Sequence, residues 1–166
     1  MTTTITPAWP ADVPVILRLI RALADYERLS HQVVATEADL HAALFATAGG
    51  PECLIAREHG EAVGFALYFH NFSTFLGRRG LYLEDLFVEP AQRGKGHGRA
   101  LLQRLAAIAV ERGCGRLEWS VLDWNTPAIG FYESLGATVM PDWRICRMTG
   151  ERLQAFAAGT DGDTEG

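Results

Sequence analysis

The sequence has no surplus of basic residues, since its 166 residues include 15 Lys and Arg against 20 Asp and Glu, for a formal net charge of −5. Binding to nucleic acid or to an anionic membrane surface requires an excess of cations that can neutralise phosphates. We therefore expect neither partner. A partner selected by charge should itself be a cation.

Cysteine is scarce, and long apolar runs are absent. The three cysteines, Cys53, Cys114 and Cys146, are widely spaced and form no Cys-x-x-Cys pair, which argues against a disulfide framework and a zinc site. The five histidines show no metal-ligand spacing, so we expect no metal. The N-terminus lacks the features of a signal peptide, and no stretch approaches the roughly 18 apolar residues of a membrane span. These absences predict a cytoplasmic protein.

The length and the hydrophobic fraction of 48% are typical of one compact domain that folds without disulfides. We find no internal repeat and no Pro-, Gly- or Ser-rich linker before the last eight residues. We predict a single domain over residues 1–158. We predict a disordered tail over residues 159–166, because GTDGDTEG offers no apolar anchor.

Hydrophobic periodicity and start and stop signals predict alternating strands and helices. The expected strands are Thr3 to Thr6, Cys53 to Arg57, Val63 to Phe69, Gly80 to Val88, Arg116 to Leu122 and about Arg144 to Met148. The expected helices follow Asp12, Thr36, the loop at Gly98 and Asn125 or Thr126, and a short last helix covers Glu151 to Ala157. Thr36 and Asp39 form a capping-box pattern.

A glycine-rich loop lies between the strand that ends at Val88 and a long helix. It reads Arg93-Gly94-Lys95-Gly96-His97-Gly98 and contains the single lysine of the chain. Free N–H groups and the positive dipole at a helix N-terminus suit a phosphate, and glycines let the backbone approach it. Neither a Walker A loop nor a dinucleotide loop occurs. We predict a phosphate site. The alternative is a flexible turn whose glycines only permit tight packing.

Two motifs of the sequence are Arg93-x-x-Gly96-x-Gly98 and Asn125-x-Pro127 followed by Phe131-Tyr132-x-x-x-Gly136. They resemble the motifs of the GCN5-related N-acetyltransferase (GNAT) family, whose members bind acetyl-coenzyme A. Tyr82-Leu83-Glu84-Asp85 and Tyr26-Glu27 resemble the diamine (spermidine/spermine) and thialysine N-acetyltransferase branch. The resemblance runs from about Thr4 to Arg147. It implies an α/β (α+β) fold with a mixed, mostly antiparallel sheet of six to seven strands, helices on both faces, and a homodimer.

By this resemblance, the backbone of Leu86 to Val88 holds the acetyl and pantetheine arm, and the amides of the glycine loop hold the pyrophosphate. Asn125 contacts the pantetheine. The implied coenzyme-binding residues are Leu86, Phe87, Val88, Arg93, Gly94, Lys95, Gly96, His97, Gly98, Arg99 and Asn125.

Acetyl transfer to an amine requires a neutral amine and a proton for the departing thiolate, because an alkylammonium has a pKa near ~10.4. Resemblance favours Glu84 as the substrate-facing acid and as the base acting through water. Asp85 points to the opposite strand face unless the strand bulges, and we favour a structural role for it, capping loop amides or pairing with an arginine. Tyr132 is the expected acid. Its alternative is a core aromatic of an amphipathic helix.

The expected reaction is direct attack, in a ternary complex, by a primary amine of a small diamine- or polyamine-like cation. The substrate-binding candidates are Glu27, Glu84, Asp85, Glu118 and Trp119. A thialysine or other amino-acid substrate stays open, because Arg28 to His31 is less acidic than a polyamine enzyme would need. A non-catalytic acyl-CoA-binding module and a protein acetyltransferase are also open. Phe69 to Phe75 could instead fold over a small substrate.

Overall fold

The structure is a computed structural model that describes residues 3–159, and the chain divides into two compact units, Met1–Ser120 and Val121–Gly166. The single domain over residues 1–158 stays a prediction. The predicted tail, apart from Gly159, lies outside the described residues.

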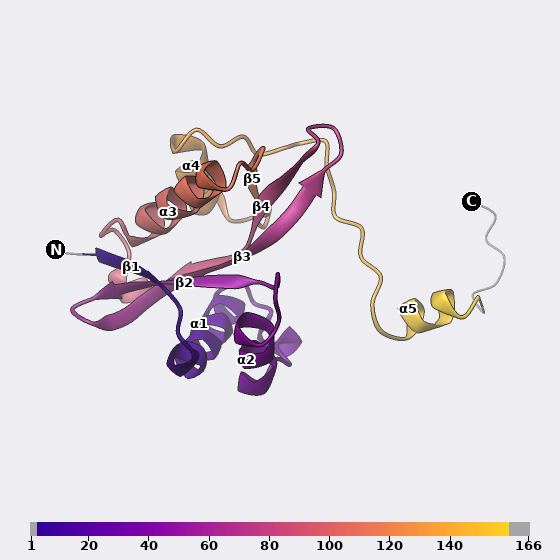
Figure 1. Cartoon of the computed structure of the whole chain (residues 1–166), viewed down its shortest axis with the longest axis horizontal. Helices are drawn as coiled ribbons and strands as arrows, with labels where there is room; N and C mark the ends of the chain where they lie inside the picture. The colour runs from indigo at the N-terminus through magenta and orange to yellow at the C-terminus, as the bar shows by residue number, and fades with distance from the viewer. Residues whose placement is uncertain (1–2, 160–166) are drawn as a thin grey trace. The chain divides into compact units, whose positions relative to one another are not determined.

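The first unit contains a five-stranded sheet in the order β1-β2-β3-β4-β5 (Figure 1). Its strands are β1 (Thr3–Pro7), β2 (Glu52–Glu58), β3 (Glu61–Ser73), β4 (Arg78–Val88) and β5 (Leu117–Trp119). The first four pair antiparallel and β5 pairs parallel to β4. The mixed, mostly antiparallel sheet is confirmed. The expected six to seven strands are too many for residues 3–159, where the sheet has five.

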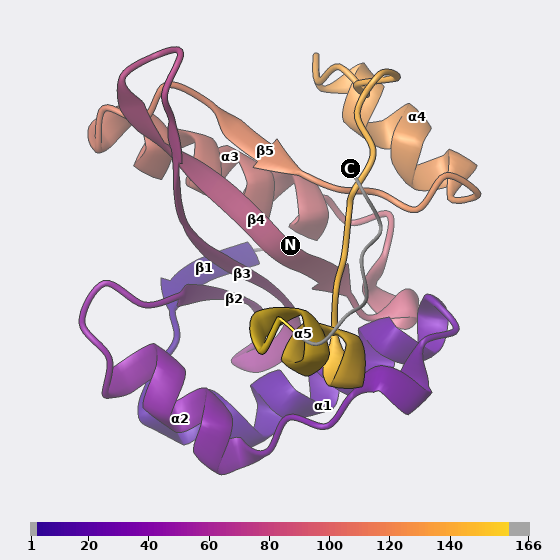
Figure 2. The same ribbon diagram turned by 90° about the vertical axis from the view of Figure 1, so that its right-hand side faces the viewer.

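Helices cover both faces of this sheet. The long helices of the first unit are α1 (Val13–Tyr26), α2 (Glu37–Phe45) and α3 (His97–Glu111), with short 3-10 turns at Pro10–Asp12, Ser30–Gln32 and Pro90–Gln92. Figures 1 and 2 show α1 and α2 on one face and α3 on the other. The capping box of α2 forms as the sequence predicts, with Thr36 Oγ1 accepting from Asp39 N and the Asp39 carboxylate accepting from Thr36 N.

Apolar side chains of α1 and α3 fill the space on the two sides of the sheet. On the α1 side, Ile16 and Leu19 pack with Ile55, Phe65 and Phe87 in one buried cluster. On α3 the buried apolar residues are Leu101, Leu102, Leu105, Ile108 and Ala109. Both helices contact β4, so this strand lies between the two helical layers.

A β-bulge interrupts β4. Leu67 of β3 pairs with Asp85, but the next residue, Tyr68, pairs with Leu83, so Glu84 is the extra residue. The pairing of β5 with β4 also ends at Leu83. Beyond that residue, no strand within residues 3–159 continues the sheet on the β5 side of β4.

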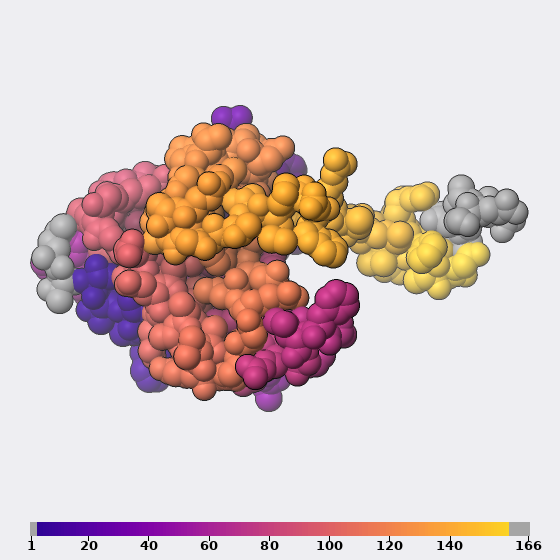
Figure 3. Space-filling view, turned by 90° about the horizontal axis from the view of Figure 1, so that it is seen from above, coloured from indigo at the N-terminus to yellow at the C-terminus, as the bar shows by residue number. Residues whose placement is uncertain are grey.

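The segment Phe69 to Phe75 lies mostly within β3. Its first five residues continue β3 as far as Ser73, and Phe72 and Ser73 pair with Arg79 and Arg78 of β4. The turn that follows stands at the surface (Figure 3), where Phe75 is 99% exposed. These residues therefore form the far end of the β3–β4 hairpin.

The second unit contains α4 (Thr126–Ser134) and α5 (Gly150–Ala157). Asn125 is the N-cap of α4, and its Oδ1 accepts a hydrogen bond from Ala128 N at 3.4 Å. The strand expected at Arg144 to Met148 is wrong, because these residues form no strand in the structure. Alternating polar and apolar residues favour a strand, but a strand forms only where a partner supplies the ladder hydrogen bonds.

Candidate active site

The glycine loop joins β4 to α3 through two residues in left-handed conformations. Gly94 has φ +81° and Gly96, the N-cap of α3, has φ +86°. A Cβ at either position would meet nothing within 4 Å, so these glycines serve the backbone conformation and not close packing. This finding goes against the alternative in which they only permit tight packing.

The start of α3 presents free backbone donors. No side chain of the described residues 3–159 caps Gly96, and the hydrogen bond from Ala100 N to Gly96 O, 3.0 Å long, closes the first turn. The N–H groups of His97, Gly98 and Arg99 precede that bond and have no acceptor in the helix. Such a terminus is suited to an anion.

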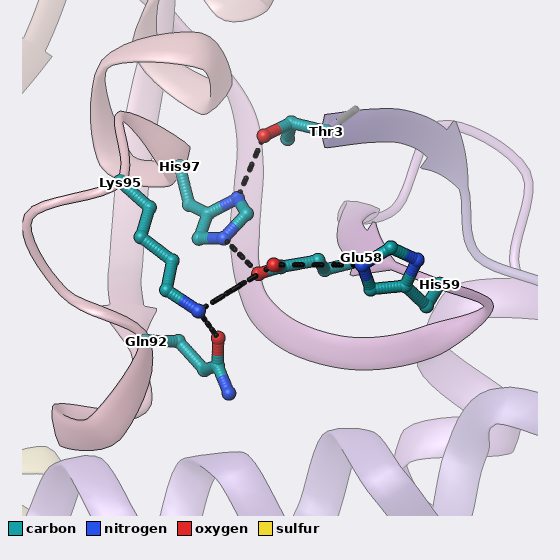
Figure 4. Close-up of polar contacts among 6 residues, drawn as sticks. All are labelled: Thr3, Glu58, His59, Gln92, Lys95 and His97. Atoms are coloured by element: carbon teal, nitrogen blue, oxygen red, sulfur yellow. Dashed lines mark hydrogen bonds and ion pairs between the residues drawn. The ribbon is translucent and has the colours of Figure 1, made fainter. Parts of the chain in front are cut away.

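The side chains of the loop do not all face the same way. His97 is 2% exposed, and its ring Nε2 lies 3.0 Å from Oε2 of Glu58. The Lys95 ammonium donates to Gln92 at 2.7 Å and lies 3.4 Å from the same Glu58 (Figure 4). The Arg99 side chain is exposed. The His97 ring therefore does not face an anion at the loop, and only its backbone N–H is placed to do so.

Arg93 is folded back onto the sheet. Its Nε donates to the carbonyl of Val88 at 3.0 Å, and its guanidinium lies 4.8 Å from the Tyr26 ring centroid and 5.4 Å from that of Phe87. An ion pair between Arg18 of α1 and Glu89 ties the same region together. These contacts fix the end of β4 against the end of α1.

Three predicted acids gather at the end of α1 and the bulge of β4. Burial raises the pKa of Asp85 to about 6, and the negative charges of Glu84 and Glu27 raise it further. Burial also raises the pKa of Glu27. Glu84, at the bulge, is exposed. We call Glu27, Glu84 and Asp85 the acidic cluster.

Glu84 and Asp85 are adjacent on β4, so in a regular strand they would face opposite sides. The bulge interrupts this alternation of faces, which allows both acids to act on the same surroundings. Asp85 has no arginine or backbone amide as a bonding partner among residues 3–159. The structural role expected for Asp85, as a cap of loop amides or a partner of an arginine, is therefore not what the structure shows.

The remaining predicted residues lie on β5 and in the second unit. Glu118 and Trp119 lie opposite Tyr82 and Leu83 in the parallel ladder, and Glu118 pairs with Arg116 at 3.0 Å. In the second unit, Asn125 caps α4 and Tyr132 lies within α4.

Two residues that contact the loop were missed from the sequence. Glu58 and Thr3 both bind the His97 ring, from β2 and β1. Both are far from His97 in sequence and no motif links them to it. The only available signal was the unusual presence of a histidine at the first position of a buried helix face.

Neither a metal site nor a membrane span is found in the part of the chain that the structure describes. Residues 3–159 contain no group of three or more His, Cys, Asp or Glu placed to hold a metal ion. Among the same residues, no helix has the length and apolar content needed to cross a membrane.

Comparisons with known proteins agree with this geometry. Residues 18–137 match the Acetyltransferase (GNAT) family. The chain is 37% identical to an L-ornithine N5-acetyltransferase of Arabidopsis thaliana, over 90% of this chain and 85% of the relative. It is 40% identical to a thialysine N-epsilon-acetyltransferase of Bos taurus, over 86% of this chain and 89% of the relative.

A solved structure extends the likeness to the fold. An integron cassette protein from the mobile metagenome of V. cholerae superposes with a TM-score of 0.78 and 30% identity, covering 95% of this chain and 98% of that protein. Transfer of an acyl group from a phosphate-bearing donor to an amine needs a site for the phosphate and a carboxylate for the amine. The helix-start N–H groups of the glycine loop and the acidic cluster can supply these two features. This chain belongs to the GNAT acetyltransferase family and is an acyltransferase of the acetyl-coenzyme A-dependent N-acetyltransferase type.

Proposed function

We propose that this protein transfers the acetyl group of acetyl-coenzyme A directly to the primary amine of a small cationic substrate of the diamine or polyamine class. The observation that carries the proposal is the acidic cluster, which lies at the end of α1 and at the bulge of β4, the strand that leads into the glycine loop. A substrate with a second positive charge gains from these carboxylates, whereas a neutral amine does not.

The first unit has two features that fit the coenzyme. The helix-start N–H groups of His97 to Arg99 suit its pyrophosphate. The β5 side of Leu86, Phe87 and Val88 is not continued by another strand of the described sheet, so these residues can bond the amides of the pantetheine arm as a strand would. The further proposed coenzyme contacts in the same loop are Arg93, Gly94, Lys95 and Gly96. Asn125 is the proposed contact from the second unit.

The acidic cluster supplies the proton acceptor. Glu84 is exposed at the bulge and is the proposed base acting through water. Asp85 is a second candidate, because its pKa of about 6 lies close to the pH at which a base must work. Bound acetyl-coenzyme A supplies the thioester carbonyl that the neutral amine attacks. Glu27, Glu118 and Trp119 are the further proposed substrate contacts.

Tyr132 is the proposed acid that protonates the departing thiolate. It lies within α4, next to Phe131, and the two rings are 5.7 Å apart. A phenol is a suitable donor for this step, because it keeps its proton at neutral pH until the negative charge develops on sulfur.

An amino acid with a side-chain amine is the second candidate substrate. Two of the relatives are an ornithine and a thialysine acetyltransferase. Such a substrate carries a carboxylate that a diamine lacks, and Arg28, directly after Glu27, is a cation at the edge of the acidic cluster.

The test is the release of coenzyme A thiol from acetyl-coenzyme A with diamines, polyamines, ornithine, thialysine and an N-terminal peptide as acceptors. We expect the small cationic amines to be acetylated, and we expect Glu84→Gln and Tyr132→Phe each to lower kcat by about 100-fold. Unchanged turnover in both variants would refute these assignments. Tight acetyl-coenzyme A binding without acetylation of any acceptor would identify a non-catalytic binding module, and acetylation of the peptide alone would identify a protein acetyltransferase.

The homodimer is also a proposal. It is supported by the likeness to the diamine and thialysine branch. Size-exclusion chromatography with light scattering should give twice the mass of one chain, and a single-chain mass at micromolar concentration would contradict it.

A further inference from the structure

A buried polar network joins three elements at the start of α3. His97, the first residue of α3, places Nε2 3.0 Å from Glu58 Oε2 at the end of β2 and Nδ1 2.9 Å from Thr3 Oγ1 of β1 (Figure 4). Glu58 and His97 are 7% and 2% exposed. One tautomer of the His97 ring satisfies both contacts, with Nε2–H donating to the carboxylate and Nδ1 accepting from the hydroxyl.

The same carboxylate also holds the only lysine of the chain. Lys95 Nζ lies 3.4 Å and 3.5 Å from the two Glu58 oxygens and donates to Gln92 at 2.7 Å. The pKa of Glu58 is lowered, first by the hydrogen bond from His97 and also by the charge of Lys95. Glu58 is thus an ionised carboxylate that restrains two residues of one loop.

The loop needs such a restraint. Gly94 and Gly96 flank Lys95, and both adopt the left-handed conformation that glycine enters and leaves freely. Without a contact from outside the loop, the ordering of these residues would have to occur when the ligand binds, which weakens binding. The Glu58–His97 contact removes that cost, because it fixes the first turn of α3 before any ligand arrives.

We propose that Glu58 and His97 are positioning residues that hold the helix-start N–H groups and Lys95 in place for the phosphate end of the coenzyme. This inference rests on the proposed function. It assigns His97 a structural partner inside the protein, and it makes Glu58, on the β2–β3 hairpin, part of the coenzyme site although it does not face the ligand.

The direct test is Glu58→Gln, which keeps the shape of the side chain and removes its charge. We expect the KM for acetyl-coenzyme A and the Kd for coenzyme A, measured by calorimetry, to rise about tenfold. The kcat and the KM for the amine should stay within about twofold, because Glu58 lies away from the acidic cluster. A loss of kcat together with the amine KM would indicate general damage and would overturn the proposal.

Glu52→Gln is the matched control. Glu52 is also a glutamate of β2, and it also forms an ion pair, with Arg112 at 2.6 Å and 2.9 Å, but it lies at the other end of the strand from the glycine loop. Its variant should bind coenzyme A as the unchanged protein does. Equal weakening of coenzyme A binding in both variants would overturn the proposal, because loss of any β2 ion pair would then be sufficient to weaken binding.

A second variant keeps the test valid if Glu58→Gln fails to fold. Glu58→Leu combined with His97→Leu replaces the buried pair by apolar side chains, a change that proteins often accept without loss of stability. We expect this double variant to fold and to have a raised Kd for coenzyme A. A folded double variant that binds coenzyme A as tightly as the unchanged protein would refute positioning.

The single lysine gives a readout that a purely structural role would not move. An amine-reactive ester labels only Lys95 and the N-terminal amine, and mass spectrometry separates the two products. We expect Lys95 to react faster in Glu58→Gln, and coenzyme A to slow its labelling in the unchanged protein. Equal labelling rates would overturn the proposal. An unchanged protein that binds no coenzyme A at all would instead refute the proposed function.

Discussion

Asp85 shows how one side chain couples the site to the stability of the fold. In the folded protein its pKa is about 6, above its ordinary value of 3.8, chiefly because the carboxyl is buried. The folded state therefore binds this proton more tightly than the unfolded state does. The ionised group destabilises the fold above pH about 6, and this effect fades as the pH falls towards 4.

We predict that Asp85→Asn stabilises the protein at pH 8 by about 2–3 kcal/mol, since one pKa unit corresponds to about 1.4 kcal/mol. The stabilisation should vanish near pH 4, where the unfolded chain also holds the proton. Urea unfolding at the two pH values measures it. The exposed Glu61→Gln serves as a control that should change little at either pH. A gain that persists unchanged at pH 4 would contradict the assignment.

The pH dependence of Asp85 variants distinguishes the two candidate bases, Asp85 and Glu84. If Asp85 accepts the proton, kcat/KM should fall with decreasing pH below about 6, and Asp85→Asn should lose that dependence. Should Glu84→Gln abolish the dependence while Asp85→Asn keeps it, Glu84 is the base. Initial rates at saturating acetyl-coenzyme A between pH 5 and 9 distinguish these outcomes.

Helix α2 shows how much a local signal can determine. Thr36 and Asp39 satisfy each other's backbone N–H groups, and Leu40, one residue later, is buried in the core cluster. We predict that Thr36→Ala lowers the free energy of unfolding by about 1 kcal/mol. Thermal unfolding measures the change. Thr36→Ser keeps the hydroxyl and should behave as the unchanged protein; an equal loss in both variants would refute the capping argument.

Elements with local signals were predicted well, and those that depend on distant partners were not. The helices that follow Asn125 and Thr36 lie where the sequence places them, since caps act within a few positions. The strand at Arg144 to Met148 was wrong, because its pattern contained no information about a pairing partner. The bulge at Glu84 was considered only as a condition, because register is set by β3.

The candidate site shows the same difference between residues with local signals and residues that depend on distant partners. The glycine loop and the acids Glu27, Glu84 and Asp85 are proposed site residues that motif and resemblance indicate. The partners of the loop side chains were not indicated, since Glu58 lies 39 residues from His97 and contacts it only through the packing of β2 beside α3. Burial was likewise invisible, so the shifted pKa of Asp85 could not be foreseen.

At the scale of the whole chain, the cysteines report on unfolding. Cys53 lies in the core cluster, and burial raises the pKa of its thiol, whereas Cys146 is exposed. In a Cys114→Ser, Cys146→Ser variant, we predict that Cys53 reacts with a thiol reagent only when the sheet opens globally. Its labelling rate should then rise with urea with the slope of global unfolding. Rapid labelling in the absence of urea would show that β2 opens locally.

The interrupted pairing of β4 has a consequence for solubility. Beyond Leu83 the strand shows an edge to which no strand of the described sheet is bonded, and such an edge invites pairing with another molecule. The bulge and the negative charges of Glu84 and Asp85 oppose that pairing. We therefore expect the carboxylates proposed for acetyl transfer also to oppose aggregation, because neutralising both would leave the apolar edge at Leu86 to Val88 open to association.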